Sequence, residues 1–161
     1  MHFNKDANCC NEFLISSKFS KMDSKQTIIK LQELIGLHKL SMNQNLKAAI
    51  RVKSPIYKNF YEETAFEKMD LINQLQWRIE SISNVSLRIP LQTRILSWKS
   101  LVELDDDEIS KAYLDTHEEA LYFCYDLLTK DLLFSVSKTL NEQVHQLETT
   151  LITYGYLKRH I

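Results

Sequence analysis

Apolar side chains recur every three or four residues in four long stretches of this chain. That spacing places them on one face of an α-helix, so each stretch predicts an amphipathic helix. The first helix is expected from about residue 24 to 51 and the second from 55 to about 83. Ser54 and Pro55 mark the boundary, because Ser is a common N-cap and Pro is tolerated in a first helical turn. The short connection predicts an antiparallel pair. The core positions expected in this pair are Ile28, Leu31, Ile35, Met42, Leu46, Ala49, Tyr57, Tyr61, Ala65, Ile72, Leu75 and Ile79.

The pattern breaks over residues 84–104, where Pro90 cannot lie inside a helix. The part after Pro90 predicts one short helix. Acidic residues 105–108 then indicate the start of a third helix, because carboxylates suit the free N–H groups of a helix N-terminus. A fourth helix is expected to follow Asp131 and to run to about residue 158. The apolar positions expected in these elements are Leu91, Ile95, Trp98 and Leu101, then Ile109, Tyr113, Ala120, Phe123, Cys124 and Leu127, then Val136, Leu140, Val144, Leu147, Leu151 and Tyr154.

Two helical hairpins joined by a long connection predict an all-α fold, a four-helix bundle with one crossover in the ferritin-like arrangement. Residues 1–22 show no period and are expected to form a disordered N-terminal arm, which leaves 23–161 as the bundle domain. Asp23 and Gln26 give a D-x-x-Q capping pattern at the start of the first helix. Since this signal follows Met22 directly, we hypothesise that Met22 is the physiological start.

Composition supports an all-helical chain and excludes several classes of site. Only two glycines and two prolines occur among 161 residues, too few for the tight turns of a β-rich domain. The glycine-rich loops that hold nucleotide phosphates are also missing. The net charge of −1 gives no basic excess for nucleic-acid binding. Residues 1–53 are nevertheless basic and residues 54–161 acidic, which favours packing of the first helix beside acidic ones.

The cysteines and the hydropathy pattern favour a cytoplasmic protein. Cys9 and Cys10 are adjacent and Cys124 lies far along the chain. This odd number and this spacing do not match the paired cysteines of a disulfide-stabilised protein. Cys124 falls on an apolar helical face and is expected to be an inert core residue. No apolar run reaches the roughly 18 residues that span a bilayer, so no membrane association is expected.

The segment SWKSLVELDDDEISKAYLDTHEEALYFCYDLL resembles bacterial ferritin-like four-helix-bundle proteins of unknown function, typically about 150 residues long. A Trp precedes an acidic helix start, and Glu118 and Tyr125 follow seven residues apart. FYEETAFEKMDLINQL in the second helix is also similar to the family. The resemblance covers about residues 24–158 and implies the fold, with no established reaction and no catalytic residue.

Ferritin-like bundles often bind two metal ions through inward-facing Glu and Glu-x-x-His motifs. Glu142 and His145 form such a motif, but each lies far around the fourth helix from Leu140 and its apolar stripe. Glu63 and Glu67 in the second helix are also off their stripe, and neither has a His three residues later. The sequence therefore predicts no metal site.

Three basic residues occupy interior positions near the middle of the predicted bundle. His38 and His117 lie on the apolar faces of the first and third helices, and Lys68 lies on that of the second. Glu118 and Glu119 follow His117 directly and flank the third helix at that level. One interpretation is a polar layer that binds an ion, a small ligand or a bis-His haem. The other is a set of polar residues that fix helix register, with Lys68 paired to Glu118 or Glu119.

No complete catalytic motif is present, so the sequence favours a non-enzymatic bundle without cofactor. Such a protein would act through protein–protein contact, as a homo-oligomer or with a protein partner. The alternative is a metal-binding oxidase or iron-storage bundle containing two irons or two manganese ions, which the family resemblance suggests.

Overall fold

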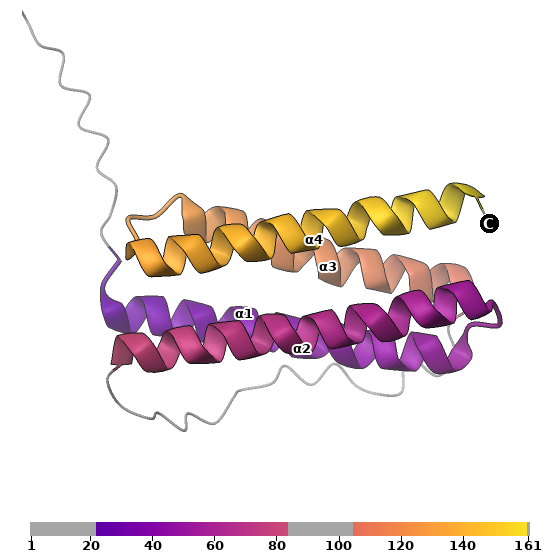
Figure 1. Cartoon of the computed structure of the whole chain (residues 1–161), viewed down its shortest axis with the longest axis horizontal. Coiled ribbons are helices and arrows are strands. Elements are labelled where there is room, and N and C mark those ends of the chain that lie inside the picture. The colour runs from indigo at the N-terminus through magenta and orange to yellow at the C-terminus, as the bar shows by residue number, and fades with distance from the viewer. Residues whose placement is uncertain (1–21, 84–104, 161) are drawn as a thin grey trace, which may run out of the picture.

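A computed structural model describes residues 22–83 and 105–160 of the protein. Every regular element formed by these residues is a helix: α1 (Ser24–Arg51), α2 (Pro55–Ser83), α3 (Asp106–Leu128) and α4 (Phe134–His160) (Figure 1). The all-helical prediction is confirmed for this part of the chain. The predicted arm over 1–22, apart from Met22, and the predicted short helix after Pro90 lie outside the described residues.

The helix starts lie where the capping signals predict them. The Asp23 carboxylate accepts a hydrogen bond from the Gln26 N–H at 2.7 Å. Asp105 and Glu108 form a reciprocal capping box, in which each side chain accepts from the other residue's backbone N–H at 2.9 Å. Pro55 is the first residue of α2. The hydrogen bonds of Asp23, Asp105 and Glu108 satisfy N–H groups that a helix start would otherwise leave without a partner. Pro55 has no N–H to satisfy.

The four helices form a square in which α1 and α4 each pack against both α2 and α3. At one end, the cluster of Ala48, Phe60, Ile109 and Tyr154 joins the end of α1, the starts of α2 and α3, and the end of α4. Helices α1 and α4 therefore run in one direction and α2 and α3 in the other, as Figure 1 shows. The end of α2 and the start of α3 consequently lie at opposite ends of the bundle.

Buried positions along each helix alternate in steps of three and four, the spacing that keeps one seam of a helix facing its neighbours. Leu46 is 42% exposed, so its predicted core position is wrong. The adjacent Asn45 takes the seam position instead. The seam residues are Leu31, Leu34, His38, Ser41, Asn45 and Ala48 of α1; Tyr61, Thr64, Lys68, Leu71 and Leu75 of α2; Tyr113, His117, Ala120, Cys124 and Leu127 of α3; and Val136, Leu140, Gln143, Leu147, Thr150 and Tyr154 of α4.

Buried apolar residues at the seam and beside it form two clusters, with polar side chains between them. An aliphatic cluster, which includes Leu34, Leu75 and Leu140, fills the end where α1 begins. An aromatic cluster built around Phe60, Tyr113 and Tyr154 fills the other end, with ring centroids 4.8–5.7 Å apart. Among the described helices, none has both the length and the apolar character needed to cross a bilayer.

Candidate binding site in the middle of the core

Each helix contributes one buried polar side chain to a layer in the middle of the core. These side chains are His38 of α1, Lys68 of α2, His117 of α3 and Gln143 of α4, and none is more than 1% exposed. We call these four residues the polar layer. The helical spacing predicted the interior placement of His38, Lys68 and His117, and the structure agrees. Their role in binding stays a prediction.

Gln143 fixes both the position and the tautomer of His38. The side-chain amide of Gln143 donates to the carbonyl oxygen of Leu71 at 3.0 Å, so its Oε1 is left to accept. That oxygen lies 3.1 Å from His38 Nε2, which must therefore be the protonated ring nitrogen. The other ring nitrogen, Nδ1, keeps its lone pair, and it is buried without a hydrogen-bond partner among the described residues.

His117 is held in the same tautomer by a different contact. Its Nε2 lies 3.0 Å from the carbonyl oxygen of Leu147, which can only accept, so Nε2 carries the proton. The ring also packs against Tyr113, with centroids 5.4 Å apart. Its Nδ1 is buried and has no partner in the described part of the chain. The layer thus contains two imidazole lone pairs that accept no hydrogen bond from residues 22–83 or 105–160.

Lys68 lacks the partner expected from the sequence. Glu118 and Glu119 are exposed, and Lys68 Nζ is buried with no hydrogen-bond partner among the residues described. The predicted ion pair is therefore wrong: both carboxylates lie on the outer face of α3. Within the described ranges Lys68 is the only buried Lys, Arg, Asp or Glu, so no interior carboxylate balances its charge.

Burial controls the protonation of the layer. Loss of hydration lowers the pKa of Lys68 to about 7, although the nearby Glu67 carboxylate opposes this effect. Burial and the positive charge of Lys68 lower the pKa of His38 and of His117 to about 3. At neutral pH both imidazoles are therefore neutral, and Lys68 exchanges between the charged and the neutral form.

The sequence reasoning did not identify Gln143, although a signal for it was present. Gln143 lies three residues after Leu140 and four before Leu147, so it continues the alternating steps of the α4 seam. The residue was missed because only apolar side chains were used to define that seam. A polar residue at a seam position is a candidate for an interior hydrogen-bond network.

The described residues do not fit the di-metal site of ferritin-like bundles. Glu142 and His145 are exposed, as their helical angles predict. No carboxylate is buried among the residues described, and no three His, Cys, Asp or Glu side chains come together there as a metal site. A bis-His haem would also have to compete for the ring nitrogens, because both Nε2 atoms are already hydrogen-bonded.

Comparisons with known proteins add no relative from which a role could be inferred. No family model matches the chain, and no match emerges among curated proteins or solved structures. Conclusions about function therefore depend on the side chains and on where the fold places them.

Proposed function

We propose that the protein is a ferritin-like bundle that acts without catalysis, by binding a second copy of itself through the outer face of α2. The observation that carries the proposal is an apolar stripe on that face. Phe66, Met69 and Trp77 are 63%, 45% and 75% exposed, and their spacing places them in one line along the helix. Large apolar side chains gathered on one exposed face are typical of protein interaction sites.

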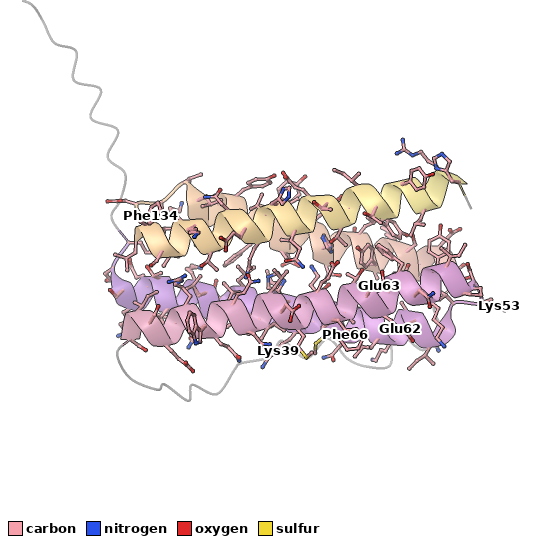
Figure 2. The ribbon with its side chains drawn as sticks, in the orientation of Figure 1. Lys39, Lys53, Glu62, Glu63, Phe66 and Phe134 are labelled. Atoms are coloured by element: carbon pink, nitrogen blue, oxygen red, sulfur yellow. The ribbon has the colours of Figure 1, made fainter. Side chains whose placement is uncertain are left out.

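The charges beside the stripe favour a second copy as its occupant. α1 contains five basic residues and one acidic residue, whereas α2 contains five acidic and three basic ones. Figure 2 shows Lys39 and Glu62 on either side of Phe66 along one edge of the bundle. A two-fold axis through Phe66 would bring Lys39 of each copy opposite Glu62 of the other. This face is therefore complementary to itself, as a symmetric dimer interface requires.

Replacing Phe66 tests the proposal. We expect the full chain to form a dimer by light scattering and Phe66→Ser to shift it to a monomer, because buried aromatic anchors contribute most of the binding energy at such interfaces. Phe134→Ser is the matched control: Phe134 is 84% exposed at the start of α4, far from Phe66 in Figure 2. A chain that stays monomeric at high concentration, or a dimer that Phe66→Ser does not weaken, would contradict the proposal.

The alternative function, a metal-dependent oxidase or iron-storage bundle, is supported only by the order and direction of the helices. The described side chains provide no buried carboxylate for it. We therefore rank it below the non-enzymatic function.

A further inference from the structure

The polar layer has unsatisfied hydrogen-bonding capacity of two complementary kinds. Lys68 Nζ offers N–H donors and, when protonated, a positive charge, whereas the Nδ1 atoms of His38 and His117 offer lone pairs. All three side chains are at most 1% exposed. Buried polar groups without partners are rare in folded proteins because each one costs free energy, and an unpaired buried charge costs most.

These three groups define the chemistry of a ligand that would satisfy them. Its charge should be negative, because Lys68 is the one buried Lys, Arg, Asp or Glu among the described residues, and the nearby Glu67 carboxylate is only partly buried and accepts a hydrogen bond from Thr150. It must also donate hydrogen bonds, because neutral imidazole Nδ1 atoms can only accept. A simple halide meets the first condition and fails the second. A metal cation could use the lone pairs only while Lys68 is neutral, because the ammonium form would repel it.

We propose that the polar layer binds a small monoanion that carries its own O–H group, a protonated oxyanion such as bicarbonate or dihydrogen phosphate. Its charged oxygens accept hydrogen bonds from Lys68, and its O–H group donates to His38 or His117. Bicarbonate has one O–H group and satisfies one imidazole. Dihydrogen phosphate has two and satisfies both. The site is separate from the α2 face, so it is independent of the proposed dimer.

Binding of the anion and protonation of the Lys68 amine should favour each other. In the free protein the amine titrates near neutral pH, because burial lowers its pKa to about 7. A bound anion stabilises the ammonium form and raises that pKa. Binding at slightly alkaline pH therefore takes up a proton. The two imidazoles stay neutral, so they remain acceptors for the anion's O–H group.

Thermal unfolding of the full chain in bicarbonate, phosphate and chloride of equal ionic strength tests the proposal. We expect one of the two oxyanions to raise Tm by about 4 °C over chloride at roughly ten times its Kd. The rise should be lost in Lys68→Met and kept in His145→Ala, a control at an exposed histidine. With bicarbonate, only one of His38→Leu and His117→Leu should lose the response. With phosphate, both variants should lose the rise in Tm.

A second measurement does not depend on how the variants fold. Calorimetric titration of the natural chain, in two buffers of different ionisation enthalpy, should show proton uptake with the oxyanion and none with chloride. Equal Tm shifts in all three salts would overturn the proposal, as would a response retained in Lys68→Met. Oxyanion binding without proton uptake would place the anion at a surface cation instead of at Lys68.

Discussion

At the scale of single residues, Lys68 determines how stability responds to pH. In the unfolded chain its amine has the ordinary pKa near 10.5, and burial lowers this pKa to about 7 in the folded state. Between these two values the unfolded chain binds more protons than the folded one. The free energy of unfolding therefore rises with pH across this window and is lowest below about pH 7. His38 and His117 face the same interior, but burial lowers their pKa values from 6.5 to about 3, so their effect on stability lies below this window. Burial raises the pKa of Cys124 from 9.0 to about 12, so this thiol opposes the rise above about pH 9, and the effect of Lys68 is best measured between about pH 7 and pH 9.

Lys68→Met should remove this dependence and stabilise the protein. Methionine fills a similar volume without a buried charge, so we expect the free energy of unfolding to increase by about 1–4 kcal/mol near neutral pH. Urea unfolding across the pH window, in a buffer without oxyanions, measures both effects. Lys53→Met, at an exposed lysine, is the control and should leave the slope unchanged. A variant less stable than the natural chain would show that Lys68 has a partner whose loss is costly.

The residues of the layer differ in how far the sequence could predict them. His38, Lys68 and His117 could be placed inside because helical spacing alone determines which face a residue occupies. The lack of an ion pair between Lys68 and Glu118 or Glu119 could not be predicted, since that depends on how α2 and α3 are rotated against each other. Glu118 lies next to His117 in sequence, and one step along a helix turns a side chain by about 100°. That rotation is enough to place it in solvent.

At the scale of elements, helix boundaries were the most predictable feature. Asp23, Pro55 and Asp105 start their helices where expected, because caps are local interactions between residues a few positions apart. Helix orientation was less predictable in detail. Leu46 is exposed although it continues the apolar spacing of α1, because the polar Asn45 occupies the seam beside it. A pattern that counts only apolar residues assigns such a position to the wrong side chain.

The orientation of α4 gives a prediction at this scale. Leu147 is 1% exposed, so Leu147→Ala should lower the free energy of unfolding by about 2–5 kcal/mol. His145 is exposed, so His145→Ala should change the free energy of unfolding by less than about 0.5 kcal/mol. Urea melts of the two variants measure the contrast. An equal loss of stability in both variants would mean that α4 is rotated about its axis relative to this structure. Glu142 and His145 would then again be candidate metal ligands.

At the scale of the whole molecule, the bundle separates the two proposed sites. The polar layer lies between an aliphatic and an aromatic cluster, where water is excluded and an unpaired group is costly. The stripe of Phe66, Met69 and Trp77 lies outside, on α2. The four long amphipathic helices of residues 22–83 and 105–160 could be predicted from the sequence. The face that we propose for dimerisation could not, because it depends on which side chains of α1 and α2 come to lie beside each other.

The central claim is that two copies bind each other through the outer face of α2. Reversing the charges beside Phe66 tests this claim most directly. Glu62→Lys places Lys39 of each copy against a second lysine, and Lys39→Glu places Glu62 against a second carboxylate. Each variant alone should sediment as a monomer of about 19.0 kDa. In an equimolar mixture every contact again joins opposite charges, so we expect a heterodimer of twice that mass. Variants that dimerise alone, or a mixture that stays monomeric while the natural chain dimerises, would contradict the account.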